Sequence, residues 1–301
     1  MSIISFDIYK ERFERLLSDN TFSDLEFDSR VEDLIYQVPI GAMQLNHTPF
    51  LIRTSLLDKD ETCSNISRCS YVPDFIKYKI PLQRCNLDRQ QVFYASIPGG
   101  MTNFSDGAQP SLMETMAQRI VDDPTFDGRH AVASRWQIKR HPIFWFLPHY
   151  IGSIKSNENF KFLFNHMDSF LRENSASNDH FQNFTEKLNY LSELFCSNDK
   201  KERIYKVTAN YFNKVMDSFR PFNNVYDALI YPSANTKGEG MNIVLTKEYV
   251  DNKNIFCDIV VLYTINRNPS DFKNISFMPF AQAIPDEFGN LEFKPLDARM
   301  I

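Results

Sequence analysis

The feature that most constrains the fold is a block of three helical patterns between segments that have the composition of β-strands. Residues 155–222 carry apolar side chains at the three- and four-residue spacing of amphipathic helices. Many of these side chains are aromatic, so they line a ligand-binding pocket or form a packed core. Core packing is the favoured interpretation. Strands that pair across so large an insertion require a core whose two halves meet in space. The pattern predicts an α+β fold.

The segments around this block define the predicted organisation. Residues 3–45 have helical periodicity until Pro39 and Gly41 interrupt it. We expect an N-terminal helical extension over residues 1–46 and a single domain over 47–301 that contains the helical insertion at 155–222. The predicted strands lie at 48–53, 91–96, 131–147, 226–231, 241–245 and 255–263, the remaining predicted helix lies at 110–121, and the tail after residue 266 is expected to be irregular.

Composition and charge exclude several classes of protein. The net charge of −5 gives no electrostatic reason to expect nucleic acid as a partner. The most apolar stretch, residues 142–148, is bracketed by prolines and is much shorter than a bilayer requires. It is expected to be a buried loop or an edge strand rather than a membrane-docking loop. With no apolar leader near the N-terminus, the chain is predicted to be cytoplasmic and to have no membrane partner.

The cysteines and histidines show no metal-ligand spacing. The five cysteines form no CxxC pair, and their odd number indicates reduced thiols in the cytoplasm. None of the six histidines pairs with a nucleophile or with another ligand at a recognised spacing. We therefore expect no metal. Cys85 has two interpretations: a reactive thiolate, because the neighbouring Arg84 is a cation, or a small side chain that fills space.

The candidate functional residues are spread over about half the chain. They lie in Gln83-Arg84-Cys85-Asn86, at Tyr94 and Glu114, and in Tyr231-Pro232-Ser233-Ala234 and Met241-Asn242-Ile243. A carboxylate beside a ribose can stabilise the oxocarbenium-like state formed when a glycosidic bond breaks. Arginine binds a diphosphate through bidentate contacts, an aromatic ring stacks on a base, and a hydroxyl at a strand end can fix a polar group. This inventory indicates a cleft that holds a charged dinucleotide. The chain has no Walker-type, GxGxxG, HExxH or GxSxG motif.

These residues, in this order, resemble the RES-domain family. Its members have an early arginine on a strand, an Arg-x-Asn turn, a tyrosine about ten residues later, a glutamate on the next helix, and a Pro-Ser-Ala strand end followed by a strand that bears an asparagine. The corresponding segments here are Leu51-Ile52-Arg53, Gln83-Arg84-Cys85-Asn86, Val92-Phe93-Tyr94-Ala95-Ser96, Ser111-Leu112-Met113-Glu114, Tyr231-Pro232-Ser233-Ala234 and Met241-Asn242-Ile243. The match covers residues 47–120 and 225–265.

The resemblance implies a fold, an activity and a set of roles. The fold is an ADP-ribosyltransferase-like mixed β core, and the activity is cleavage of the nicotinamide–ribose bond of NAD, with water, phosphate or a protein side chain as acceptor. Glu114, Tyr94 and Ser233 would be catalytic, and Arg53, Arg84 and Asn242 would bind the nucleotide. Characterised members are toxins paired with a helix-turn-helix antitoxin, so NAD and such an antitoxin are the expected partners.

Two alternatives to an enzyme remain open. Each candidate residue also has an ordinary structural interpretation: surface ion pairs for the arginines, packing for Tyr94, a helix-dipole contact for Glu114 and a turn or cap for Ser233. If these structural interpretations hold, the chain is a non-catalytic nucleotide- or partner-binding module that retains the RES-like fold, or a scaffold whose helical insertion binds another protein. In the ADP-ribosyltransferase-like core, one cleft is expected to be lined by Arg53, Arg84, Tyr94, Glu114 and Ser233.

Overall fold

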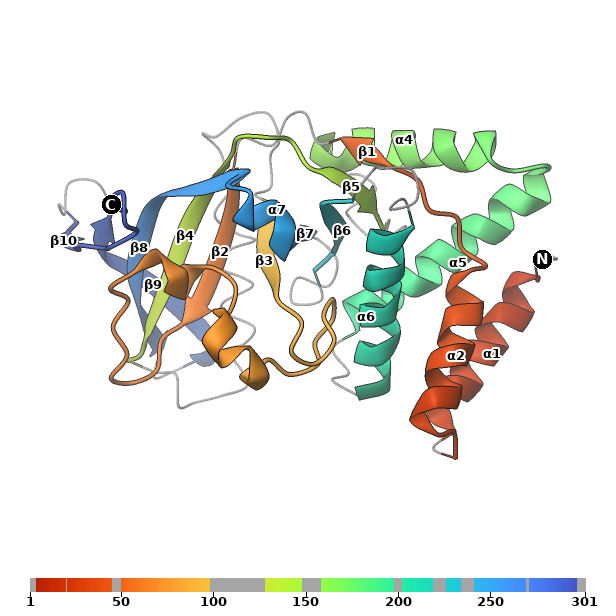
Figure 1. Cartoon of the computed structure of the whole chain (residues 1–301), viewed down its shortest axis with the longest axis horizontal. Coiled ribbons are helices and arrows are strands. Elements are labelled where there is room, and N and C mark those ends of the chain that lie inside the picture. The colour runs from red at the N-terminus through yellow and green to blue at the C-terminus, as the bar shows by residue number, and fades with distance from the viewer. Residues whose placement is uncertain are drawn as a thin grey trace.

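The computed structural model describes residues 4–19, 21–44, 50–97, 128–147, 158–197, 202–218, 226–233, 241–268 and 271–296. It combines one large mixed sheet with several helices, so the predicted α+β class is confirmed. The sheet extends across the molecule, with the N-terminal helices at one end and β10 at the other (Figure 1). The predicted helix at 110–121 lies outside the described residues.

The sheet has ten strands in the order β1-β5-β6-β7-β3-β2-β4-β8-β9-β10. Their bounds are β1 Met43–Gln44, β2 Phe50–Leu56, β3 Val92–Ile97, β4 His130–Ile138, β5 Ile143–Phe146, β6 Ala228–Pro232, β7 Met241–Thr246, β8 Ile255–Asn268, β9 Asp271–Ala283 and β10 Lys294–Pro295. β5 and β6 pair in parallel, and the other neighbours are antiparallel. β2 and β3 share a single registered pair, Ile52 with Ser96.

The helical block is the crossover between the two parallel strands. It consists of α4 Glu158–Glu173, α5 Asn178–Cys196 and α6 Glu202–Asp217, which lie in the chain between β5 and β6. A parallel pair cannot be joined by a tight turn, because the chain must return to the same end of the sheet. Leu163, Met167, Leu188, Leu191 and Val207 are completely buried. The core interpretation of the helical stripes is therefore confirmed for the described side chains.

The two N-terminal helices follow local signals. They are α1 Phe6–Ser18, which buries Tyr9, Phe13 and Leu16, and α2 Asp24–Ile35. α2 begins with a capping box, in which the Ser23 side chain accepts from the Glu26 N–H and the Glu26 carboxylate accepts from the Ser23 N–H. The helical pattern ends before Pro39, as predicted, and the chain then forms β1 against β5. Residues 43–44 are thus strand, although they lie inside the segment predicted to be a helical extension.

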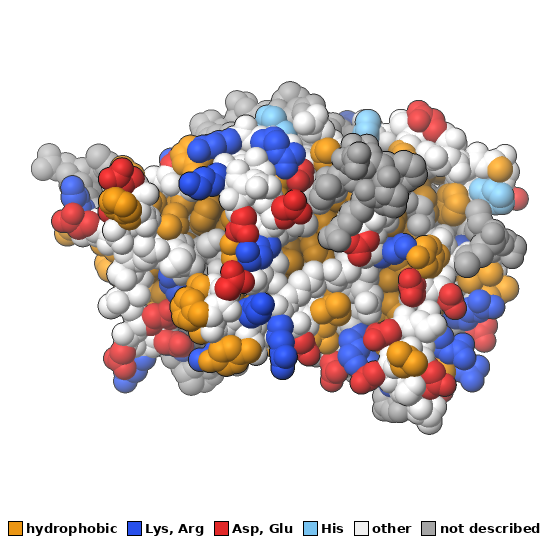
Figure 2. Space-filling model, viewed as in Figure 1, with side chains coloured by type: hydrophobic (Ala, Val, Ile, Leu, Met, Phe, Trp, Pro, Cys, Tyr) orange, Lys and Arg blue, Asp and Glu red, His pale blue; other side chains and the backbone are white. Residues whose placement is uncertain are grey.

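Short helical segments complete the fold around the sheet. They are the 3₁₀ turns η1 Ile66–Cys69 and η2 Asp74–Lys79, and the short helix α7 Lys247–Asp251. Acidic and basic side chains are interleaved on the face drawn in Figure 2, including the area over α1 and α2. No helix within the described ranges is long and apolar enough to cross a membrane.

The described part of the apolar stretch, residues 142–147, contains the buried strand β5. Phe144, Trp145, Phe146 and Leu147 are all completely buried, and β5 is second from the edge of the sheet, covered there by the two residues of β1. The prediction of a buried segment is confirmed, and the alternative of a membrane-docking loop is wrong. Burial follows because α4 packs over the strand: the Phe146 ring lies 5.3 Å from the Phe164 ring.

The prediction for the C-terminal tail is wrong. The tail was expected to be irregular after residue 266, but Asp271–Ala283 form the long strand β9, paired antiparallel with β8. Pro279 lies within this strand although proline cannot donate to a ladder of hydrogen bonds. It is accommodated opposite Tyr263, where the register shifts at a bulge, and β9 has only the two residues of β10 on its other side.

Candidate functional site

The turn that carries the Arg-x-Asn sequence is shaped by its asparagine. The Asn86 side chain is almost completely buried and donates to the carbonyl oxygens of Pro81, at 2.9 Å, and Leu87, at 3.0 Å. Across the same turn, the Gln83 N–H donates to the Asn86 carbonyl at 3.0 Å. The side-chain amide of Asn86 therefore stabilises the conformation of the turn.

Tyr94 connects this turn to the sheet. Its hydroxyl accepts from the Cys85 N–H at 2.8 Å and donates to Asn86 Oδ1 at 2.9 Å. Burial raises the pKa of the Tyr94 hydroxyl well above its ordinary value, and the nearby Cys85 and Tyr231 act in the same direction. The phenol is therefore protonated and donates at neutral pH. The ring as a whole is only half-buried, so one part of it remains available for contact.

Arg84 points toward the helical block. Its guanidinium donates to the carbonyl oxygens of Phe195 and of Ser197, the latter at 2.9 Å, and it makes a longer contact of 3.4 Å with the Leu194 carbonyl. These carbonyls lie at the C-terminal end of α5, where helical carbonyls lack partners within the helix and a positive charge is favourable. The guanidinium also lies 5.6 Å from the Tyr205 ring centroid in α6. In this structure Arg84 joins the turn to α5 and α6.

Arg53 lies on β2, beside β3. Its Nη1 donates to the Tyr94 carbonyl at 2.7 Å, and its guanidinium lies 5.3 Å from the centroid of the buried Phe93 ring. Successive side chains of a strand point to opposite faces. The Phe93 ring, with Arg53 over it, therefore lies on the other side of β3 from the Tyr94 ring. The Arg53 guanidinium therefore lies on one face of β3 and the Tyr94 ring on the other.

Ser96 and Asn242 form a polar pair across two strands. Ser96 of β3 is directly opposite Asn242 of β7, which is opposite Tyr231 of β6. The Ser96 hydroxyl donates to Asn242 Oδ1 at 3.3 Å. Directly opposed residues share a face, and Tyr94 shares it because it is two residues from Ser96. Tyr94, Ser96, Asn242 and Tyr231 thus occupy one face of β3, β7 and β6.

Ser233 and Glu114 complete the predicted set. Ser233 follows the last residue of β6 and is 2% exposed, so its hydroxyl lies in the interior at the end of this strand. Glu114 lies outside the described residues. The expected approach of Glu114 to Arg84 therefore stays a prediction.

Cys85 is completely buried, and burial raises the pKa of its thiol despite the neighbouring Arg84 cation. A thiol with a raised pKa is a poor nucleophile at neutral pH. This environment favours the space-filling interpretation over the reactive thiolate.

Two residues of the site were missed by the sequence reasoning. Ser96 and Tyr231 lie within the segments that resemble the family. Each is two positions along a strand from a predicted site residue, and this spacing could have identified both. Ser96 is two residues after Tyr94 on one strand, and Tyr231 is two residues before Ser233, so both belong to the face that carries the expected site.

Two pockets formed by described residues lie away from these residues. One, of about 910 Å³, is lined by residues of α2 and α6, and another, of about 660 Å³, by residues of α1 and α2 and their neighbours. None of the six predicted site residues lines either pocket. Within the described residues, no group of three or more histidine, cysteine, aspartate or glutamate side chains could hold a metal ion.

The sequence was compared with protein-family models and with curated proteins, and neither comparison finds a match.

Proposed function

We propose that this chain is an NAD-consuming enzyme with an ADP-ribosyltransferase-like core, which cleaves the bond between nicotinamide and ribose. The acceptor is water, phosphate or a protein side chain. The proposal rests on the resemblance of the motif segments to the RES-domain family, and on the way those segments are connected in three dimensions.

The observation that carries the proposal is the convergence of distant segments on one face of three adjacent strands. The Arg-x-Asn turn is bonded to Tyr94 through Asn86 Oδ1 at 2.9 Å. Two residues later on β3, Ser96 bonds Asn242, which is 146 positions away in the sequence. This convergence supports the proposal because the resemblance assigns these same segments to one nucleotide site.

The chemistry assigns a role to each group. Glu114 would stabilise the oxocarbenium-like state through the ribose 2′-hydroxyl, because a nearby carboxylate favours developing positive charge. The half-buried Tyr94 ring would stack on nicotinamide, while Ser233 and Asn242 would fix polar groups of the nucleotide. Arg84 would bind the diphosphate and would then divide its donors between the diphosphate and the carbonyls of α5. Arg53, expected to share this role, lies over Phe93 on the face of β3 opposite the Tyr94 ring and takes no part on this face.

One observation favours the non-catalytic alternative. The polar groups of Arg84, Tyr94 and Asn86 are all bonded within the protein, which is the pattern expected of residues retained for the fold. In that case the chain is a nucleotide- or partner-binding module. It would bind NAD or a protein without releasing nicotinamide.

The test is the release of nicotinamide from NAD by the purified full chain. Glu114→Gln keeps the size of the side chain and removes its charge. We expect it to lower turnover by about 100-fold, which corresponds to about 2.7 kcal/mol of transition-state stabilisation, while NAD affinity is retained. The control is Glu11→Gln, which changes an exposed glutamate of α1 and should leave turnover unchanged.

The outcomes separate the two functions. Full activity of Glu114→Gln contradicts the catalytic assignment, and binding of NAD without nicotinamide release by the unmodified chain supports the non-catalytic module. If the enzyme is a toxin, its expression should arrest bacterial growth, and a helix-turn-helix antitoxin should relieve the arrest. NAD cleavage without arrest leaves the enzyme assignment intact and removes the toxin assignment.

A further inference from the structure

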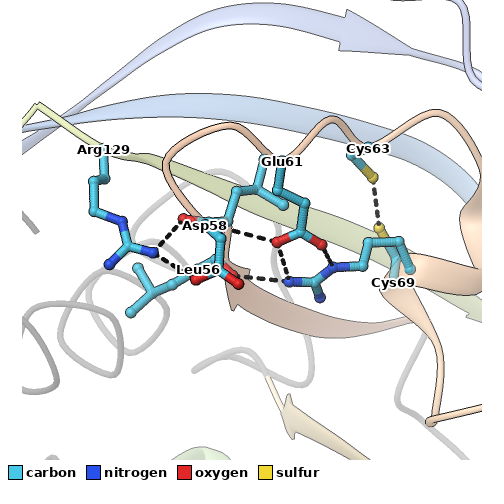
Figure 3. A network of polar contacts seen from close by, with 8 residues as sticks. Leu56, Asp58, Glu61, Cys63, Cys69 and Arg129 are labelled. Atoms are coloured by element: carbon cyan, nitrogen blue, oxygen red, sulfur yellow. Dashed lines mark hydrogen bonds and ion pairs between the residues drawn. The ribbon is translucent and has the colours of Figure 1, made fainter. Parts of the chain in front are cut away.

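Two cysteines outside the candidate site lie against each other in the interior. The sulfur atoms of Cys63 and Cys69 are 3.7 Å apart, and the side chains are 5% and 1% exposed (Figure 3). Five residues separate them in the chain, a spacing that matches no recognised redox motif. The fold brings them together because the chain turns back through η1, where the Asn65 side chain accepts from the Ser67 N–H.

We propose that Cys63 and Cys69 are a redox-active pair that a peroxide converts into an intramolecular disulfide. The thiols need only a small movement, because a disulfide requires its sulfur atoms about 2.05 Å apart and these are already in contact. Rotation about the Cα–Cβ bonds is the motion that would bring them into bonding distance.

The surroundings make Cys63 the nucleophile. Its thiolate would accept a hydrogen bond from the Cys69 thiol, and this bond, together with the nearby Arg68 cation, lowers the pKa of Cys63. Arg68 is held in position by Glu61, and its Nη2 donates to the Leu56 carbonyl at 2.9 Å. The hydrogen bond to Cys63 raises the pKa of the Cys69 thiol, and burial acts in the same direction, so this thiol is the proton donor of the pair.

The other cysteines are poorer candidates. Burial raises the pKa of Cys196 to about 12 and that of Cys257 to about 12. The Cys257 thiol donates to the Ile259 carbonyl at 3.4 Å. Cys85 is completely buried, with a raised pKa. Thiolate character is thus favoured at Cys63 and opposed at these three positions. Oxidation follows thiolate character as well as exposure, and of these thiols only Cys196 is more than slightly exposed.

The reaction proceeds in two balanced steps. The Cys63 thiolate attacks one oxygen of hydrogen peroxide, which breaks the O–O bond, gives the sulfenic acid and releases hydroxide, which takes up a proton to become water. Cys69 then attacks the Cys63 sulfur as its thiolate, the S–O bond breaks, and a second water leaves after protonation. Together the two thiols lose two protons and two electrons, and the peroxide takes up both and is reduced to two waters.

The disulfide would restrain a segment that holds the end of the chain. The Ile66 N–H donates to the Gly289 carbonyl at 2.8 Å, and the Leu291 N–H donates to the Ser64 carbonyl at 2.9 Å. Both contacts are made by residues between the two cysteines. Closing this loop covalently limits the unfolded conformations of the segment, so the contacts to the C-terminal part should open less often.

The sequence provides a direct test of the bond. Trypsin cleaves after Lys59, Arg68 and Lys77, so the two cysteines fall in separate peptides, 60–68 and 69–77. The full chain would be treated with hydrogen peroxide, blocked with N-ethylmaleimide and digested without reductant. We expect the two peptides to be found joined by a disulfide, and to separate when a reductant is added.

Two variants define the specificity. Cys257→Ser should retain the linked peptides, whereas Cys63→Ser should abolish them, with Cys63→Ala as the substitute if the serine variant does not fold. Linked peptides that instead contain Cys257, sulfinic acid at Cys63 without any linkage, or two separately blocked peptides would each overturn the proposal. The linkage in the unmodified chain decides the question even if both Cys63 variants fail to fold.

Discussion

Lys187 is the most unusual single residue of the interior. It lies on α5, is completely buried and donates from Nζ to the Ile4 carbonyl at 2.6 Å. The ammonium is 5.3 Å from the Tyr9 ring centroid, and no carboxylate of the described residues forms an ion pair with it. Burial lowers the pKa of Lys187 to about 8, because the charged form loses its hydration.

This residue should make stability depend on pH. The pKa of Lys187 is about 8 in the folded chain and 10.5 in its ordinary state. Between these values the unfolded chain binds the proton more strongly, so the free energy of unfolding rises as the pH is raised. Lys187→Met should raise the free energy of unfolding by about 1–3 kcal/mol near pH 7, and the gain should shrink as the pH approaches about 10.

Urea denaturation at several pH values measures this effect. The control is Lys59→Met, which changes an exposed lysine and should alter the free energy of unfolding little at any pH. A Lys187→Met variant that is less stable than the unmodified chain across the whole range would show that the bond to Ile4 outweighs the cost of burying the charge.

Among the elements, α5 depends most on a residue far from it in the sequence. Its N-terminus follows a local signal, because the Ser177 side chain accepts from the His180 N–H. Its C-terminus has no basic residue in the last turn. The positive charge that stabilises the last carbonyl groups of α5 comes instead from Arg84, which is about 110 positions earlier in the chain. The turn at 83–86 thereby connects the sheet with the helical crossover.

Arg84→Ala should destabilise the protein through this contact. A hydrogen bond that involves a charged group contributes about 1.5–3 kcal/mol net of the bonds to water that it replaces, and we expect a loss of about 1–3 kcal/mol in the free energy of unfolding because Arg84 is only partly buried. Arg84→Lys should lose less, because it keeps the charge without the planar fork. Denaturant unfolding of both variants measures the loss.

NAD affinity of the same variants tests the second role of Arg84. Calorimetric titration of the folded Arg84→Ala variant should give weaker binding if Arg84 also contacts the diphosphate. Unchanged stability would contradict the contact with α5, and unchanged affinity in a folded variant would leave Arg84 with a purely structural role.

At the scale of the whole molecule, the larger of two hydrophobic clusters among the described residues joins the helices to the sheet, while a smaller one around Ala131, Ala133 and Ile265 lies apart from it. The larger cluster includes Phe13 of α1, Phe93 of β3, Phe195 of α5 and Leu291 near the C-terminal end. Trp136 contributes from the sheet, where its ring centroid is 4.9 Å from that of Phe93. Trp145 contributes beside the helical block, where its Nε1 donates to the Tyr211 hydroxyl at 2.7 Å. A continuous core of this kind couples the helices to the sheet.

The two tryptophans allow this coupling to be tested. Trp136→Phe leaves Trp145 as the only fluorescent tryptophan, and Trp145→Phe leaves Trp136. We expect each variant to unfold in urea with a fluorescence midpoint equal to its circular-dichroism midpoint, because a single core unfolds cooperatively. A fluorescence midpoint for Trp145 below the circular-dichroism midpoint of the same variant would show that the helical block unfolds as a separate unit.

The sequence alone determined the features that depend on neighbours a few residues apart. The helices α1, α2, α5 and α6 follow from apolar side chains at helical spacing, and several strands follow from short apolar segments, because both periodicities are properties of the local backbone. The candidate residues could also be found in this way, since their residue types and order are visible without a structure. The sequence indicated what each of these side chains can do chemically, but not which residues each one contacts in the folded chain.

Only the tertiary structure decided which distant groups meet. β9 forms because β8 offers it a ladder of hydrogen bonds and a bulge opposite Pro279, and no local pattern contains that information. In the same way, Arg84 binds the carbonyls of α5, Arg53 lies across β3 from the Tyr94 ring, and Cys63 contacts Cys69. Each of these arrangements is set by long-range pairing and packing, which depend on the whole chain folding at once.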